Sequence, residues 1–210
     1  MNFLDLRRDF GKFGLDESKL PANPIALFAA WMEEARLDGI PEFNAMVLST
    51  VDADSRPSSR IVLLKEISEN AGLVFYTNYL SKKGRDLRRN PNASINFYWR
   101  ELERQIRVDG FVRKTSREIS DKYFRTRPLE SQLAAIVSPQ SEPINRLADL
   151  KKQAEKLFIS GEKISLPDYW GGYELVPETM EFWQGGKNRL HHRIEYRLET
   201  KQWKKIRLAP

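Results

Sequence analysis

The pattern of hydrophobic and polar positions predicts a protein that is mainly β, with a few added helices. One helix is clear near the N-terminus, where Asn23 can cap it, Pro24 suits its first position and Gly39 can end it. Apolar residues recur there at helical spacing and form one broad face: Ile25, Phe28, Ala29, Trp31, Met32 and Ala35.

Short β-prone segments bounded by turn residues make up much of the remaining chain. The strands expected from them are residues 45–51, 59–66, 73–77, 93–99, 104–114, 172–176, 180–183, 190–198 and 202–208. Asp109-Gly110 predicts a bulge in the fifth of these. Further helices are expected at 81–89, 116–127, 129–137 and 143–160. Many short strands with few helices favour a closed barrel with helical additions. We expect residues 1–20 to form an irregular arm and residues 21–210 a single domain, with a helical segment at 116–160 and C-terminal strands at 172–208.

Composition excludes several kinds of chemistry. The chain has no cysteine, which rules out disulfides, thiolate metal clusters and thiol nucleophiles, and its two histidines are too few for a three-histidine zinc site. The longest apolar run, Ile25 to Met32, is too short to cross a bilayer, and charges interrupt the N-terminal residues. We therefore expect a soluble, cytoplasmic protein that holds no metal. A net charge of +6 favours an anionic partner, either nucleic acid or a phosphorylated small molecule.

The chain has no glycine-rich phosphate-binding loop, so side chains would have to hold a phosphate. The segment Arg60 to Lys65 is an apolar strand with a cation at each end. Strict alternation places the two cations on opposite faces, so they would serve different anions unless a bulge intervenes. The alternative is a buried strand whose ends simply reach solvent.

A second cationic segment runs from Tyr76 to Arg85, where a strand end leads into a helix capped by Ser81. Lys82 and Lys83 lie in the first turn of that helix, where cations oppose the helix dipole. A phosphate at the helix N-terminus would compensate them. Solvated surface lysines are the alternative.

A third segment follows Glu181. If residues 189–193 form a strand, Arg189, His191 and Arg193 share one face and His192 points the other way. Such a face suits an anionic ligand better than a protein core, although a surface strand would also explain it. A weaker signal is the helical pair Tyr123 and Arg127, with Ser131 close behind, which could hold a second phosphate.

Taken together, these segments resemble the pyridoxamine 5′-phosphate oxidase family, and the likeness extends over almost the whole chain. It rests on segments that occur in the family's order: Arg60–Lys65, Phe75–Asn78, Leu102–Arg107, Tyr123–Pro128, Val137–Ser141, Glu181–Gly186, Arg189–His191 and Arg207–Pro210. The resemblance implies an FMN-binding split β-barrel and a homodimer with FMN at the subunit interface.

The resemblance also implies which residues would form the site. The residues that would hold FMN are Arg60, Ile61, Val62, Tyr76, Thr77, Lys82, Lys83, Gln105, Gln140, Ser141, Trp183 and Arg193. The residues that would hold the substrate are Lys65, Tyr123, Arg127, Ser131, Arg189 and His191. Of these, Arg189 and His191 would position the substrate and assist proton movement.

The implied reaction is the oxidation by O₂ of pyridoxamine and pyridoxine 5′-phosphate to pyridoxal 5′-phosphate. It releases H₂O₂, and ammonia from the amine, which makes the protein an oxidoreductase acting on CH–NH₂ donors. One alternative is a split-barrel FMN oxidase of the phenazine-biosynthesis type, whose substrate lacks the phosphate. Another is a nucleic-acid-binding module, which would need one contiguous basic patch rather than discrete clusters.

Three positions depart from the family's usual residues. Lys82 stands where arginine is common, which keeps the charge but loses bidentate geometry. His192 stands where an acidic residue is frequent, and alternation turns it away from the ligand. Phe10 replaces a tyrosine, which argues against a lid role for Arg7 to Phe10.

Overall fold

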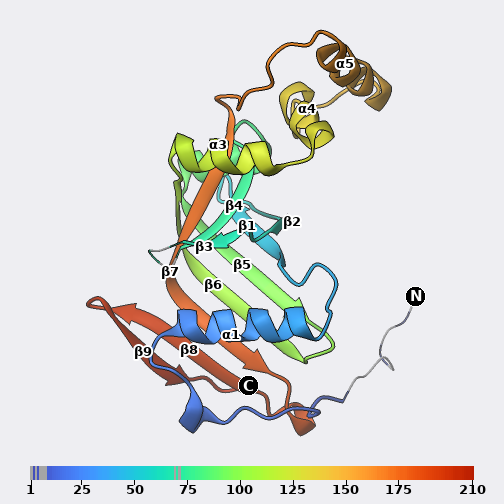
Figure 1. Cartoon of the computed structure of the whole chain (residues 1–210). Helices are drawn as coiled ribbons and strands as arrows, with labels where there is room; N and C mark the ends of the chain where they lie inside the picture. Colours follow the sequence, from blue (N-terminus) through green and yellow to red (C-terminus); the bar gives the residue numbers. More distant parts are fainter. Residues whose placement is uncertain (1, 3, 5–8, 69, 71) are drawn as a thin grey trace.

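The computed structural model describes residues 2, 4, 9–68, 70 and 72–210. Its described strands form one nine-stranded antiparallel sheet in the order β2-β1-β5-β6-β7-β4-β3, and β8 and β9 extend it from one end of β7 (Figure 1). The strands are β1 (Ala45–Val51), β2 (Pro57–Leu63), β3 (Glu66–Ile67), β4 (Leu73–Asn78), β5 (Asn92–Trp99), β6 (Arg104–Lys114), β7 (Trp170–Gln184), β8 (His192–Glu199) and β9 (Gln202–Arg207).

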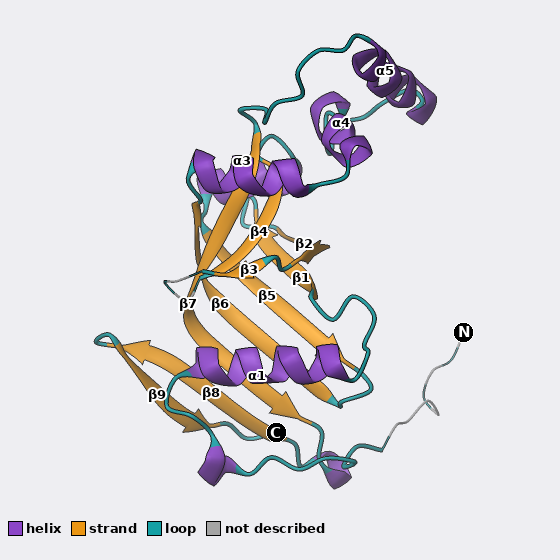
Figure 2. Cartoon of the chain, viewed as in Figure 1, coloured by secondary structure: helices purple, strands orange, loops and turns teal. Residues whose placement is uncertain are grey.

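The helices begin where the sequence offers a cap. Asn23, Ser81 and Ser116 each accept a backbone N–H of the first helical turn, as predicted. The α-helices are α1 (Pro24–Leu37), α2 (Lys82–Arg89), α3 (Arg117–Thr126), α4 (Leu129–Val137) and α5 (Leu147–Ile159), with short 3₁₀ turns at Glu17–Lys19 and Lys187–Arg189. In Figure 2, α1 lies across the half of the sheet that is near β8 and β9. The helices α3, α4 and α5 lie at the opposite end of the sheet.

The sheet curls without closing. Among the described strands, β2 and β3 end the strand order and do not pair with each other. The expected closed barrel is therefore corrected to an open, curled sheet, and the split-barrel fold class is confirmed. The predicted bulge is present, because the register between β6 and β7 shifts between Asp109 and Gly110.

Four predicted boundaries are wrong in an informative way. The segment predicted at 59–66 ends as a strand at Leu63 and resumes only as the short β3. Residues 172–176 and 180–183 belong to one strand, β7. β8 starts at His192 instead of residue 190, and α5 starts at Leu147 rather than near Pro143.

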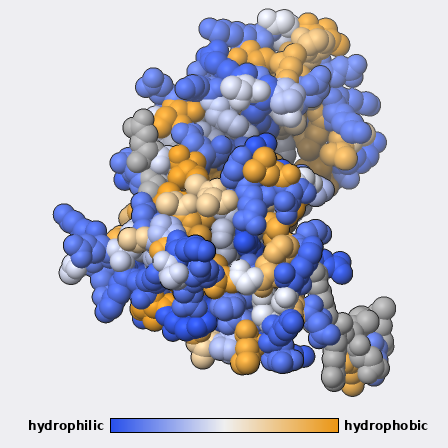
Figure 3. All heavy atoms as spheres, turned by 60° about the horizontal axis from the view of Figure 1, so that its bottom comes forward, coloured by the Kyte–Doolittle hydropathy of each residue, from blue (hydrophilic) through white to orange (hydrophobic). Residues whose placement is uncertain are grey.

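Two hydrophobic cores hold these elements together. The larger packs α1, through residues such as Phe28 and Trp31, against the inner face of the sheet. The smaller contains Phe124, Leu166 and Trp170, and it packs α3 against the start of β7. Hydrophilic residues cover most of the face shown in Figure 3, with hydrophobic ones between them. No helix in the described part of the chain is long and apolar enough to span a membrane.

Candidate functional site

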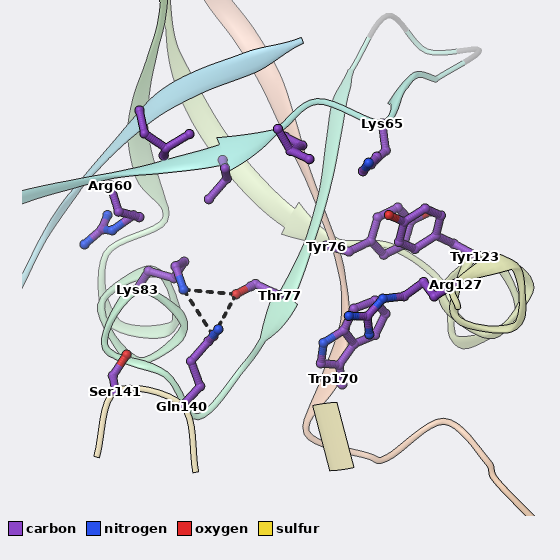
Figure 4. Close-up of a pocket in the computed structure, with 13 residues that line it drawn as sticks. Arg60, Lys65, Tyr76, Thr77, Lys83, Tyr123, Arg127, Gln140, Ser141 and Trp170 are labelled. Carbon is purple, nitrogen blue, oxygen red and sulfur yellow. Dashed lines mark hydrogen bonds between the residues drawn. The ribbon is translucent and has the colours of Figure 1, made fainter. Parts of the chain in front are cut away.

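A cavity of about 530 Å³ opens where β2, β4, α2 and the end of α3 meet. Figure 4 shows it with its lining residues drawn as sticks. The lining combines cations, hydroxyl and amide groups and aromatic rings: Arg60, Ile61, Val62, Leu63, Lys65, Tyr76, Thr77, Lys83, Tyr123, Arg127, Gln140, Ser141 and Trp170. Within the described residues, the lining contains four cations and no carboxylate. An anion is the ligand that such a wall favours.

Arg60 and Lys83 lie together at one end of this cavity (Figure 4). The Arg60 guanidinium donates to the Leu48 carbonyl at 3.1 Å, Thr50 Oγ1 at 2.8 Å and Ser58 Oγ at 2.6 Å. These acceptors are neutral, so they orient the guanidinium without cancelling its charge. The buried carboxylate of Asp86 contacts one of these acceptors, because it accepts a hydrogen bond from Thr50 Oγ1 at 2.9 Å.

Lys83 extends from the first turn of α2 into the same end. Its Nζ donates to Gln140 Oε1 at 3.2 Å and Thr77 Oγ1 at 3.3 Å. Burial, with the nearby Arg60 charge, lowers the pKa of Lys83 to about 8. Burial also lowers the pKa of Arg60. The two cations are thus held close together and partly desolvated, an arrangement that an anion would relieve.

The opposite end of the cavity holds Lys65, Tyr123 and Arg127 against aromatic rings. Tyr123 stacks on Tyr76 with 3.9 Å between ring centres, and Lys65 Nζ lies 5.9 Å from the Tyr123 ring centre. Burial raises the pKa of Tyr76 to about 12 and lowers that of Arg127. The Tyr76 hydroxyl therefore stays protonated at neutral pH, and the charge of this end comes from Lys65 and Arg127.

The two cations of the segment 60–65 therefore reach one cavity. The prediction that they lie on opposite faces of a strand is wrong, because β2 ends at Leu63 and Lys65 follows the strand. Figure 4 nevertheless shows them at separate ends of the cavity, Arg60 beside Lys83 and Lys65 near Tyr123. That Arg60 and Lys65 bind two different anions stays a prediction.

Of the site residues predicted within segments 60–83 and 123–141, two lie outside this lining. Lys82 pairs with carboxylates instead: its Nζ lies 3.1 Å from Asp86 Oδ2 and 3.9 Å from Asp52 Oδ2. Ser131 lies in the first turn of α4 and is half-buried. The structure brings the remaining predicted residues of segments 60–65, 76–83, 123–127 and 140–141 together.

A second cluster forms at the far end of β7. Gln105 on β6 pairs with Trp183 on β7, which pairs with Arg193 on β8, so the three form one row across the sheet. The Arg193 guanidinium binds Glu181 through two hydrogen bonds of 2.6 and 3.1 Å, which raises the pKa of Arg193. His191 lies beside this row, with its ring centre 4.7 Å from that of Trp183.

His191 is held in one tautomer. The backbone N–H of Gly186 donates to its Nδ1 at 3.1 Å, so the neutral ring carries its proton on Nε2. Burial and the Arg189 charge lower the pKa of His191, which favours this neutral form. Gly186 is required here, because a Cβ at this position would lie 2.2 Å from the Leu190 carbonyl oxygen.

The segment after Gly186 differs from the predicted strand. Lys187–Arg189 is a 3₁₀ turn in which Asn188 and Arg189 have φ of 55° and 62°. Arg189, His191 and Arg193 therefore do not share one strand face, and Arg189 is exposed. His192 contacts Arg207 and Glu17 at 3.3 and 3.7 Å, away from Trp183.

Two aromatic residues of these clusters were not among the predicted site residues. Trp170 lines the cavity and begins β7, and an aromatic residue just before Gly171-Gly172 is the only signal that marks it. Phe10 packs edge-on against Trp183 and His191, at 5.5 and 5.4 Å between ring centres. Part of the N-terminal arm thus reaches the second cluster, whereas Arg7 and Arg8 lie outside the described residues.

The two clusters are far apart within one chain. Trp170 begins β7 and Trp183 lies near its end, and strand geometry separates positions thirteen residues apart by on the order of 40 Å. One small ligand cannot touch both clusters of the same copy. Within the described residues, moreover, no group of His, Cys, Asp and Glu side chains is arranged to hold a metal ion.

Comparison with known proteins identifies the family of this chain. Residues 32–160 match the family model described as pyridoxamine 5′-phosphate oxidase. Residues 170–210 match the model of the pyridoxine 5′-phosphate oxidase C-terminal dimerisation region, which includes Trp183, His191 and Arg193 of the second cluster.

Individual relatives agree with these matches. The chain is 49% identical to pyridoxine/pyridoxamine 5′-phosphate oxidase 2 of Hydrogenovibrio crunogenus, over 100% of this chain and 99% of the relative. It is also 49% identical to the corresponding oxidase of Pseudomonas fluorescens, over 98% and 97%. A similar solved structure is PhzG from Burkholderia lata in complex with tetrahydrophenazine-1-carboxylic acid, with a TM-score of 0.90, 31% identity and coverage of 95% of this chain and 99% of that one. The chain belongs to the pyridoxine/pyridoxamine 5′-phosphate oxidase family.

Proposed function

We propose that this protein is an FMN-dependent oxidase that converts pyridoxamine and pyridoxine 5′-phosphate to pyridoxal 5′-phosphate, with O₂ as acceptor. The observation that carries the proposal is a single cavity with two separate pairs of cations and no carboxylate among its described lining residues. Arg60 and Lys83 bind the FMN phosphate, and Lys65 and Arg127, with Tyr123, bind the substrate phosphate. Both ligands of this reaction carry a phosphate dianion, and each pair supplies two positive charges.

The residues fit a bound FMN. The two cations at the Arg60 end are half-buried beside neutral hydroxyl and amide groups, so a phosphate there would meet donors that are not bonded to a carboxylate. Ile61 and Val62 line the same cavity and would contact the bound FMN.

The site is completed in a homodimer. This chain contains the family's dimerisation region at 170–210, and its Trp183 cluster lies too far along β7 to reach its own cavity. A partner copy brings Gln105, Trp183, Arg189, His191 and Arg193 to that cavity in our proposal. The site thus has one half from each subunit.

FMN, when bound, supplies the oxidation, because it accepts a hydride and returns electrons to O₂. The chain's own residues bind and orient the substrate. The phosphate anchors at Lys65, Tyr123 and Arg127 fix one end of the molecule, which is catalysis by positioning. The neutral His191 offers its Nε2–H as a donor to the substrate, and its Nδ1 bond to Gly186 fixes the direction of that donor.

A second candidate is an oxidase of the phenazine type. The likeness to PhzG over nearly the whole chain favours it. The cluster of Lys65, Tyr123 and Arg127 favours the phosphorylated substrate, because a substrate without a phosphate gives these cations nothing to bind.

Steady-state oxidation distinguishes the two. The purified FMN-loaded protein should produce H₂O₂ from pyridoxamine 5′-phosphate, and much less from pyridoxamine at the same concentration. Arg127→Met should lower kcat/KM for the phosphorylated substrate by about tenfold to a hundredfold and leave that for pyridoxamine nearly unchanged. Equal rates on both amines, or faster oxidation of a reduced phenazine carboxylate, would overturn the proposal.

A further inference from the structure

We propose that Trp170 is a positioning residue that presents Arg127 to the substrate phosphate. This inference rests on the proposed function and deepens it. It attributes the preference for a phosphorylated substrate to the aromatic ring of Trp170 as well as to Lys65 and Arg127. Trp170 holds the guanidinium by its ring face and thereby leaves the N–H groups free for a ligand.

The surroundings of Arg127 carry the inference. Its Cζ lies 4.7 Å from the Trp170 ring centre and 5.8 Å from that of Phe124. Its Nη1 is buried and has no hydrogen-bond partner in the protein. Among the described residues, no carboxylate lies within ion-pair distance of the guanidinium. A buried guanidinium N–H without an acceptor is costly, so this group is built to receive one from outside the chain.

An aromatic partner differs from a carboxylate in its consequence for the ligand. A carboxylate would hold Arg127 equally well, but it would occupy the N–H groups and cancel the positive charge. A ring face attracts the cation through its quadrupole and occupies none of the N–H donors. The pair therefore keeps the full charge available for a phosphate dianion.

Trp170 is itself fixed in place by the sheet. Only 7% of its surface is exposed, and it is the first residue of β7, paired with Asn78 of β4. Its backbone N–H donates to the Pro167 carbonyl at 3.1 Å. The same strand β4 carries Tyr76, whose ring lies nearly parallel to that of Trp170, with an angle of 11° between them.

The aromatic set extends across the substrate end of the cavity. The Tyr123 ring is nearly parallel to that of Trp170, at 5° and 6.2 Å between centres, and Tyr76 stacks on Tyr123. Figure 4 shows Trp170 beneath the extended Arg127 side chain, with Tyr76 and Tyr123 above it. Because Trp170 contacts Arg127 from a fixed strand, the position of the strand determines where the guanidinium lies.

The test measures binding of an unreactive ligand pair to the FMN-loaded dimer. Isothermal titration compares 4-deoxypyridoxine 5′-phosphate with 4-deoxypyridoxine, which differ only in the phosphate. The ratio of their dissociation constants reports the phosphate preference and needs no turnover. The variants are Trp170→Leu, Trp170→Phe, Arg127→Met and the double variant Trp170→Leu/Arg127→Met.

We expect Trp170→Leu to reduce the phosphate preference by about tenfold, and Trp170→Phe, which keeps a ring face, by about threefold or less. In the Arg127→Met background, Trp170→Leu should cause no further loss, because its effect passes through the guanidinium. Trp203→Leu, a matched tryptophan replacement on β9, should leave the ratio unchanged.

Two results would overturn the inference: an unchanged ratio in Trp170→Leu, or an equal loss whether or not Arg127 is present. If Trp170→Leu does not fold, Trp170→Met fills similar volume without a ring face and carries the same expectation. If Arg127→Met leaves the ratio of dissociation constants unchanged, the proposed function is contradicted instead, because Arg127 then does not bind the substrate phosphate.

Discussion

Replacement of Lys83 with methionine should change the stability of the apoprotein and its affinity for FMN in opposite directions. Lys83 sits partly buried beside Arg60, and among the described residues no carboxylate lines this end of the cavity. Methionine keeps most of the side-chain volume and removes the charge. The apoprotein loses a repulsion, and the FMN phosphate loses a partner.

The pKa of Lys83 gives the size of the first effect. A pKa lowered from 10.5 to about 8 corresponds to a penalty on the order of 3 kcal/mol for the protonated side chain at neutral pH. Lys83 is only half-buried, and screening by solvent reduces this to about 1–2 kcal/mol. We therefore expect the Lys83→Met apoprotein to be more stable by about 1 kcal/mol.

The second effect follows from the lost contact with phosphate. A hydrogen bond to a charged group contributes about 1.5–3 kcal/mol, so FMN should bind roughly tenfold to a hundredfold more weakly. Urea unfolding of the apoprotein measures the stability, and quenching of flavin fluorescence on titration measures the affinity.

Lys82→Met is the matched control on the same helical turn. Its Nζ pairs with the buried Asp86 at 3.1 Å, so its loss should destabilise the apoprotein by up to about 1 kcal/mol. It should alter FMN affinity less than Lys83→Met does. A Lys83→Met protein that is less stable and binds FMN normally would refute the reasoning.

Four further predictions follow, two on pH dependence, one on the second cluster and one on the helix that carries Lys83. FMN affinity of the wild type should fall as pH rises through about 8, where Lys83 of the apoprotein loses its proton, and fluorescence titration of Lys83→Met should show no such step. The Lys83 contribution should also make apoprotein stability rise between pH 8 and 10.5, since only the unfolded chain keeps the proton there; urea midpoints across this range test the sign. His191→Ala should lower kcat/KM for pyridoxamine 5′-phosphate by about a hundredfold, and unchanged turnover and substrate affinity would remove His191 from the site. Gly84→Ala should destabilise the protein by about 1–3 kcal/mol in thermal unfolding and weaken FMN binding, because its Cβ would lie 2.3 Å from the Tyr79 carbonyl oxygen; a normal melting temperature would contradict this packing.

Local signals in the sequence were enough to locate most elements of the fold. Ser81 and Ser116 predict helix starts because their side chains satisfy N–H groups that a helix leaves unpaired, and both do so. Asp109-Gly110 predicts the bulge for an equally local reason. The failures are those that depend on distant partners: β7 continues past Pro177 because β6 pairs with it on both sides of the bulge.

In the candidate site, too, local features were predictable from the sequence and features that depend on tertiary contacts were not. Residue types and spacing identified Arg60, Lys83 and Arg127 as anion-binding candidates, and the structure places them in one cavity. Lys82 and Asp86 stand four residues apart on the predicted helix, so the spacing is compatible with their ion pair. The spacing could not show that Asp86 also accepts from Thr50, because only the tertiary fold brings these two residues together. Nor could it reveal Trp170, whose role depends on a guanidinium that arrives from another element.

The anaerobic reaction of the FMN-loaded protein with its substrate tests the central claim most directly. Pyridoxamine 5′-phosphate should bleach the flavin absorbance in a single turnover, pyridoxamine at equal concentration should bleach it far more slowly, and admission of O₂ should restore the yellow colour. Bleaching at equal rates by both amines, a flavin that neither reduces, or a protein that takes up no FMN would contradict the account.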